Sequence, residues 1–344
     1  MISRQQMMAG KVFKDKLNRI LVLSPLPIET QHTPHDGAHI IKAKTDVYLD
    51  IGHKSVREGA ENLALVINIF NVFSIVAILS SHFLVFYNGD DSYSLYFLLS
   101  ILTGTHAFYF YNMYESFRDL KKYKFIRFNR QRREVALPFT DNQEFVIIPW
   151  EKLYAWAGTT IVIMESTAIP LSTLTITMAS PTDATDFKGR YEVAGGEEIN
   201  CIMQWECIRA FMDDGPDACP DPSKANTLAE YKATCKRQWK ELSLWAWIKR
   251  KLIDWLHYSY FSHWLNDVIE ARIQYDTVPE NIKRWSEPLP EDQWQQPSHE
   301  FLEANFRALG FYMDGGRLGD KNMPVYDPRK KVIFNSPENK PKDE

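Results

Sequence analysis

The chain lacks a recognisable catalytic motif. It contains neither the G-x-S-x-G turn of many hydrolases nor the set of motifs that marks protein kinases. Residues 315–319 are rich in glycine, but the Lys-Ser/Thr pair of a phosphate-binding loop and the strand that precedes a dinucleotide site are both missing. Members of a catalytic triad can lie far apart in a sequence, so a hydrolase stays open as an alternative. We expect a protein that is not an enzyme, with no catalytic residue and no cofactor.

Metal-binding patterns are also scarce. The chain has four cysteines, and none has the paired C-x2-C spacing of a zinc site. His32, His35 and His39 form a loose cluster near Asp36, but no predicted helix places them on one face. We therefore expect no metal site, and free thiols if the cysteines face a reducing compartment. The cysteines are Cys201, Cys207, Cys219 and Cys235.

Charge is missing from two stretches, residues 63–89 and 92–114, which are separated only by Asp90 and Asp91. Each stretch is longer than the roughly 20 residues that a helix needs to cross a bilayer. A helix of this length on a water-soluble protein would show a polar stripe, and neither stretch has a charged one. The sequence therefore predicts a transmembrane hairpin with spans of about 63–88 and 93–114. The hairpin could also support a homo-oligomer.

Basic residues follow the second stretch, beginning with Arg118, Lys121, Lys122 and Lys124, whereas the acidic hinge has none. Because Lys and Arg near span ends stay on the cytoplasmic side, we expect both termini in the cytoplasm and residues 1–62 to form an N-terminal cytoplasmic arm. The orientation of the hairpin and attraction to anionic lipid head groups then explain why basic residues follow the second stretch. The formal net charge of −4 gives no reason to expect nucleic acid as a partner.

Residues 118–216 are predicted to form a cytoplasmic β-rich domain. Short runs of alternating or β-branched residues between 125 and 179 indicate antiparallel strands, separated by polar turns and prolines. An apolar stripe of Ile202, Trp205, Ile208 and Met212 follows, which predicts a helix over residues 197–214 that Gly215 and Pro216 end. The expected fold class is membrane α+β: a two-helix transmembrane hairpin, a pleckstrin-homology-like β domain closed by a helix, and a helical C-terminal region.

Residues 224–344 are predicted to be helical and partly interfacial, with one helix near 299–309 and a disordered tail. Around residues 242–264, tryptophans and aliphatic residues alternate with a basic cluster. This mixture is typical of a helix lying in the plane of lipid head groups, although an aromatic-rich core helix is the other interpretation. The candidate membrane-interface residues are Trp245, Trp247, Lys249, Arg250, Lys251 and Trp255.

Four segments between residues 128 and 216 are structural in character: 128–135, Pro149-Trp150-Glu151, 205–212 and Asp214-Gly215-Pro216. With these segments, residues 60–216 resemble a family of bacterial inner-membrane proteins that are found beside type VI secretion effectors. The resemblance implies the cell inner membrane as the location, and a protective role as an immunity protein against a cognate toxin. The family offers no catalytic residues to carry over.

Two functions follow as hypotheses. In the first, the chain is an immunity protein whose cytoplasmic domain binds and neutralises a cognate type VI secretion effector, with the lipid bilayer as its second partner. In the alternative, it is a membrane-anchored scaffold or a lipid-surface-binding module, and reversal of the basic cluster at residues 249–251 should then weaken binding to lipid.

Overall fold

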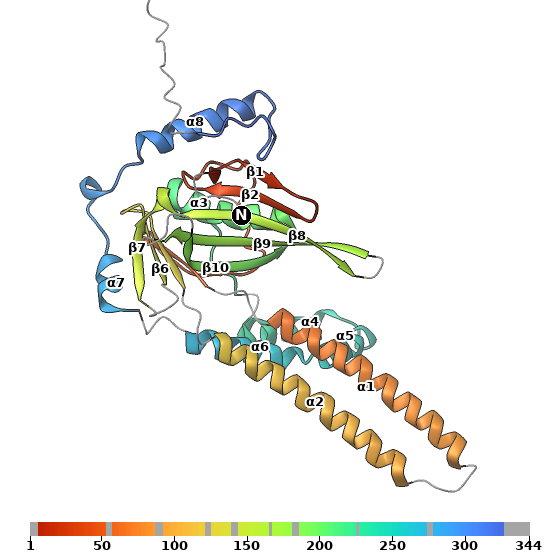
Figure 1. Cartoon of the computed structure of the whole chain (residues 1–344). Helices are drawn as coiled ribbons and strands as arrows, with labels where there is room; N and C mark the ends of the chain where they lie inside the picture. The colour runs from red at the N-terminus through yellow and green to blue at the C-terminus, as the bar shows by residue number, and fades with distance from the viewer. Residues whose placement is uncertain are drawn as a thin grey trace, which may run out of the picture.

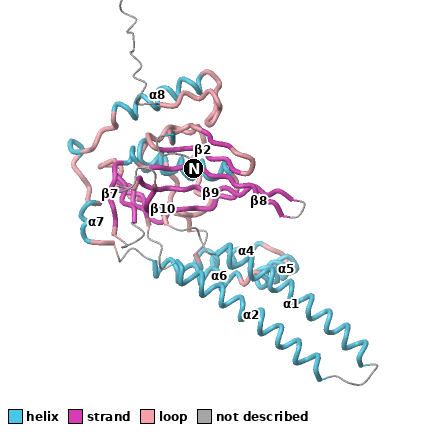
Figure 2. Tube along the Cα trace, in the orientation of Figure 1, coloured by secondary structure: helices cyan, strands magenta, loops and turns pink. Residues whose placement is uncertain are grey.

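The computed structural model describes residues 6–52, 57–86, 92–120, 125–138, 144–164, 167–180, 186–224, 227–273 and 278–326 of the 344-residue chain. Two antiparallel sheets form the body of the protein. Helices α1 (Arg57–Phe86) and α2 (Ser92–Leu120) project away from this body side by side, as Figure 1 shows. The tube in Figure 2 separates the strand-rich body from the helical part of the molecule.

The first sheet has the strand order β1-β2-β8-β9-β10, and every neighbouring pair is antiparallel. Strands β8 and β9 pair along their whole length, from Tyr154 opposite Thr177 to Met164 opposite Thr167. Their shared end extends beyond the neighbouring strands, since β2 reaches only to Thr160 and β10 only to Ser172. The strands are β1 (Val12–Lys14), β2 (Asn18–Ser24), β8 (Tyr154–Met164), β9 (Thr167–Ala179) and β10 (Phe187–Gly196).

The second sheet has the order β3-β4-β5-β6-β7. Its central pair joins β4 to β5, with Ile51 opposite Ile126, so the whole α1–α2 segment is inserted between two paired strands. Behind this junction, buried Arg127 makes two 2.7 Å bonds to the buried carboxylate of Asp50. The strands are β3 (Ile41–Lys44), β4 (Tyr48–Ile51), β5 (Ile126–Asn129), β6 (Glu134–Pro138) and β7 (Phe145–Pro149).

Residues 1–62, which the sequence predicts to be an N-terminal arm, supply strands to both sheets within their described part. The sequence interpretation placed strands only after residue 124. It missed β1 to β4 because these strands are short, and their partners β5 and β8 lie about a hundred residues further along. Such non-local pairing leaves little trace in a local pattern.

Helix α3 (Glu198–Asp213) packs against the first sheet, and its bounds lie within one residue of the helix expected from the apolar stripe. Trp205 of α3 stacks on Trp150 with 5.3 Å between ring centroids, and both side chains are fully buried. The helix ends where expected, because Gly215 adopts a φ of 109° that favours glycine. The core therefore lies between the two sheets and α3.

The predicted transmembrane hairpin is wrong. In the part of the chain that the structure describes, no helix combines the length and the apolar character needed to cross a membrane. The same finding contradicts two further predictions. These are the two-span inner-membrane localisation with cytoplasmic termini and the membrane α+β fold class. The prediction placed residues 63–114 in the bilayer, whereas Ala64, Ile67 and Tyr109 are buried at one face, packed beside Tyr258 and Phe261.

Polar side chains of α1 and α2 form hydrogen bonds to α5 and to the turn that follows it. Asn68 donates to the backbone oxygen of Leu256 at 2.8 Å, and the Tyr258 hydroxyl donates to Asn68 Oδ1 at 3.2 Å. Tyr258 also lies 2.8 Å from His106 Nε2. These contacts hold α1 and α2 to a layer of three helices: α4 (Leu228–Glu241), α5 (Leu244–Leu256) and α6 (Ser259–Ile273).

The last helices return to the body. Helix α7 (Glu280–Trp285) packs beside the second sheet, where Trp285 donates to Glu134 at 2.7 Å. Helix α8 (His299–Met313) covers the N-terminal loop of the body through Ala304, Ala308 and Tyr312. α8 begins at the residue that the sequence predicts for its helix near 299–309 and continues one turn further.

Candidate functional site

The outward face of α5 is the candidate functional site. Its side chains at positions 244, 248, 252 and 255 fall on one side of a helix with 3.6 residues per turn, and position 245 lies next to them. All five side chains are exposed, from 42% for Ile248 to 80% for Trp245. We call this set the α5 stripe: Leu244, Trp245, Ile248, Leu252 and Trp255.

Basic residues border the α5 stripe on both sides. By the same helical geometry, Lys249 lies next to Trp245, and Lys251 lies next to Leu244. Lys249 is exposed and has no hydrogen-bond or ion-pair partner among the described residues. An apolar stripe with bases along its edges is the arrangement found in helices that lie in the plane of lipid head groups.

A buried carboxylate anchors α5. Asp254 is the buried residue of this helix; it accepts from Lys251 at 3.0 Å and from the Tyr231 hydroxyl of α4 at 3.2 Å. Arg250 lies 3.2 Å from the other oxygen of Asp254. Burial by itself would lower the pKa of Lys251, but its hydrogen bonds to Cys235 and Asp254 outweigh this effect and raise it. Lys251 therefore stays charged beside the stripe.

Of the residues that the sequence predicts for a lipid interface, the structure brings Trp245, Lys249, Arg250 and Trp255 to the surface. Trp247 is only half-exposed and packs edge to face on Trp239 of α4, with 4.7 Å between ring centroids. Arg250 and Lys251 are committed to Asp254. Within residues 242–264, the exposures of α5 do not fit a core helix, whereas Ser259, Ser262 and His263 of α6 are buried.

The sequence interpretation missed three members of the α5 stripe, Leu244, Ile248 and Leu252, and the anchoring role of Asp254. Spacing of three and four residues between the apolar positions was the available signal for the stripe. The burial of Asp254 had no local signal, because its partner Tyr231 belongs to another helix.

The basic residues after α2 do not join this surface in the described part of the chain. Arg118 is exposed and pairs with Glu115 at 3.2 Å, one turn back on the same helix. Lys121, Lys122 and Lys124 lie outside the described residues.

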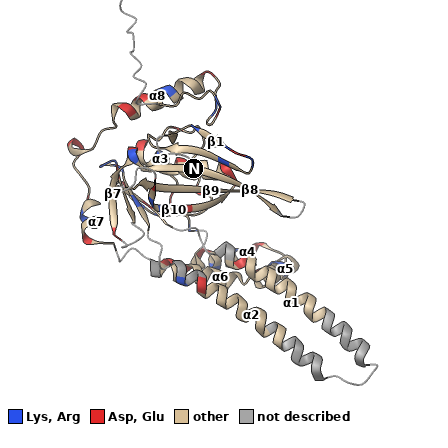
Figure 3. Ribbon diagram, in the orientation of Figure 1, with Lys and Arg blue, Asp and Glu red and all other residues tan. Residues whose placement is uncertain are grey.

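Helices α1 and α2 also expose apolar side chains, but without neighbouring bases. The described side chains of residues 60–76 and 100–114 include no Lys or Arg, and Figure 3 shows the charged residues of α2 near its end at the body. The exposed apolar residues there are Val66, Ile69, Phe70, Val72, Phe73, Val76, Phe108, Phe110, Tyr111 and Tyr114.

The histidine cluster has a structural explanation. His32, His35 and His39 lie in the loop before β3, where the buried Asp36 uses its two oxygens to accept from the backbone of Ile40 and Ile41 at 2.9 and 3.0 Å. The described residues contain no group of three or more His, Cys, Asp or Glu side chains placed to hold a metal ion. All four cysteines are free thiols.

Comparisons with known proteins found no match. No family model matches the chain, and neither the curated proteins nor the solved structures include a significant match.

Proposed function

We propose that this chain is a binding protein that docks onto anionic lipid surfaces through the α5 stripe. Docking in the head-group plane requires an amphipathic helix on the protein surface and no helix that crosses the bilayer. The single observation that carries the proposal is the exposed stripe of Leu244, Trp245 and Trp255 next to the unpartnered base Lys249. The stripe supplies apolar area and the bases supply attraction to anionic head groups.

The proposal is tested with the full chain and vesicles of phosphatidylcholine, with and without phosphatidylglycerol, in a co-sedimentation assay. We expect binding to the anionic vesicles that weakens as salt is added. Removing two tryptophans in the variant Trp245→Ser/Trp255→Ser should weaken binding at least about tenfold, since each exposed indole contributes on the order of 1 kcal/mol on insertion.

A matched control is available on α8, which exposes an apolar stripe without free bases. The variant Leu302→Ser/Phe306→Ser removes a similar amount of exposed apolar surface from that helix. It should bind vesicles like the unchanged chain. An equal loss of vesicle binding in the two variants would show that binding depends on exposed apolar surface in general, and the proposal would then fail.

One observation favours a second candidate, an immunity protein that binds a cognate protein toxin. The β8–β9 end projects beyond the sheet and carries exposed apolar residues on both faces, among them Ile163 at 64% and Leu171 at 50%. An apolar projection with free strand edges is suited to a protein partner. The resemblance to proteins found beside type VI secretion effectors supports the same function.

This candidate is tested by expressing the chain together with a toxin encoded next to it and counting surviving cells. Protection should be lost in the variant Ile163→Ser/Leu171→Ser and kept in Trp245→Ser/Trp255→Ser. Equal killing with and without the unchanged chain would remove the immunity hypothesis.

A further inference from the structure

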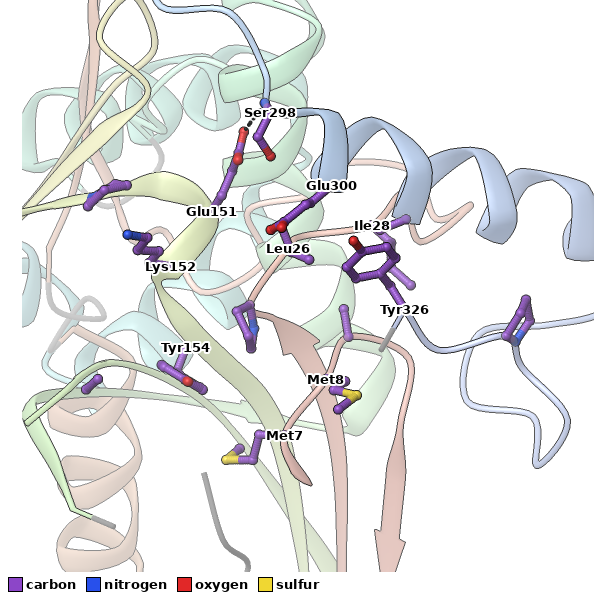
Figure 4. A pocket seen from close by; sticks show the side chains of 16 residues that line it. Met7, Met8, Leu26, Ile28, Glu151, Lys152, Tyr154, Ser298, Glu300 and Tyr326 are labelled. Carbon is purple, nitrogen blue, oxygen red and sulfur yellow. Dashed lines mark hydrogen bonds between the residues drawn. The ribbon is translucent and has the colours of Figure 1, made fainter. Parts of the chain in front are cut away.

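A cavity of about 480 Å³ lies between the body and α8, on the opposite side of the body from α1 and α2. Its walls come from the N-terminal segment, the loop after β2, the short turn after β7 and the first turns of α8. Figure 4 shows Met7 and Met8 on one side and Leu26, Ile28 and Tyr326 on another. The volume lies in the range of small-molecule sites, and most lining side chains are apolar.

Of the acidic groups at the cavity, one is already neutralised. Glu151 accepts from the backbone nitrogen of Ser298 at 3.1 Å and from the Arg133 guanidinium at 3.3 Å. Arg133 is itself buried, so this pair is part of the fold. Glu151 is therefore occupied in holding α8 against the body.

Glu300 is different, because its carboxylate has no hydrogen-bond or ion-pair partner in the described part of the chain. The base that follows it on α8, Arg307, is bound to Glu303. Figure 4 shows Glu300 directed toward the middle of the cavity beside Leu26 and Tyr326, whereas Lys152 points away at the edge. Burial, and after it the nearby carboxylates of Glu300 and Glu303, raises the pKa of Tyr326, while Arg307 acts in the opposite direction. Among the described residues that line the cavity, Glu300 is therefore a carboxylate without an ion-pair partner, at the exposed side of a mostly apolar space.

Aromatic rings complete the site. Tyr154 and Tyr326 both line the cavity, and the faces of such rings attract cations. The Tyr326 ring already has the Arg307 guanidinium 5.5 Å from its centroid, so the ring contact for an organic cation falls to Tyr154. Met7 and Met8 provide flexible side chains that adapt to an apolar body of varied shape. We propose that this cavity binds an amphipathic organic cation, with its apolar body against Met7, Met8 and Leu26 and its ammonium group at Glu300.

The test measures binding of three six-carbon probes to the full chain by isothermal titration calorimetry: hexylammonium, hexanol and hexanoate. An ion pair at a partly exposed carboxylate and a ring contact each contribute on the order of 1 kcal/mol, so hexylammonium should bind about tenfold more tightly than hexanol. Hexanoate should bind more weakly than hexanol because Glu300 repels it.

The variant Glu300→Gln should bring the affinities for hexylammonium and hexanol to within about twofold, while the affinity for hexanol stays unchanged. The matched control Glu280→Gln removes an exposed carboxylate from the first turn of α7, away from the cavity, and should keep the tenfold preference. The variant Met8→Trp places a large ring in the cavity and should reduce binding of both probes.

Failure of the unchanged chain to bind hexylammonium would overturn the proposal. Equal affinity for hexylammonium and hexanol would overturn it too, and so would a preference that survives in Glu300→Gln. Because Glu300 is exposed, its replacement leaves the fold intact, and the test holds even if Met8→Trp unfolds the chain.

Discussion

Helices α5 and α8 both turn an apolar stripe outward, yet they are held in the fold in different ways. On α8, the exposed Leu302, Phe306, Leu309 and Met313 lie opposite a buried face that packs into an apolar cluster. On α5, the buried residue is Asp254, which is bound by polar groups. α8 thus has an ordinary amphipathic arrangement, whereas α5 keeps most of its apolar side chains outside.

This difference separates a structural helix from a candidate binding helix. An apolar side chain left in water contributes nothing to folding, so a helix that exposes most of its apolar residues is stabilised by other contacts. The charges strengthen the contrast, because Lys249 on α5 has no ion-pair partner among the described residues, whereas Arg307 on α8 is paired with Glu303. The comparison can be tested one contact at a time.

The largest expected effect is on the buried face of α8. Phe301 is 5% exposed, and the guanidinium carbon of Arg133 lies 4.7 Å from the centroid of the Phe301 ring. Phe301→Ala should lower the free energy of unfolding by about 3 kcal/mol, because it removes a buried ring together with its contact to the Arg133 guanidinium and leaves a cavity. Urea unfolding followed by circular dichroism measures this loss. Phe306→Ala on the exposed stripe is the control and should change stability by less than about 0.5 kcal/mol.

A smaller loss is expected at the polar anchor of α5. Asp254→Ala leaves Lys251 and Tyr231 without their shared acceptor and should cost about 2 kcal/mol of unfolding free energy. The same urea experiment measures it, with the exposed Glu241→Ala as control. If Asp254→Ala unfolds at the same urea concentration as the unchanged chain, polar anchoring of α5 is refuted.

The smallest expected effect concerns charge next to the α5 stripe. Lys249→Glu reverses a base that attracts anionic lipid by about 1 kcal/mol, so binding to anionic vesicles should weaken about tenfold or more. Binding to neutral vesicles should not change, and added salt should shrink the difference. Lys321→Glu, an exposed base beyond α8, is the matched control. A similar loss in the two variants would contradict the role of α5.

Sequence patterns located several elements well where one helix buries its own apolar stripe. The stripe of Ile202, Trp205 and Ile208 predicted α3 within one residue, and the helix near 299–309 begins at the predicted residue. The patterns failed where the environment of a segment depended on contacts with residues far away in the sequence. The apolar residues 63–114 predicted a membrane hairpin. However, Asn68 contacts Leu256 of α5, and His106 contacts Tyr258 of the following turn, residues that lie 188 and 152 positions further along the chain.

The amino-acid sequence by itself determined the local elements: the helix periodicity, the capping glycine at 215 and the strand alternation after residue 125. Only the tertiary structure decided that β4 pairs with β5 around an inserted pair of helices, and that α5 exposes its apolar stripe while it buries Asp254. The physical reason is that local patterns reflect backbone geometry along one segment, whereas burial depends on which distant segment covers a side chain.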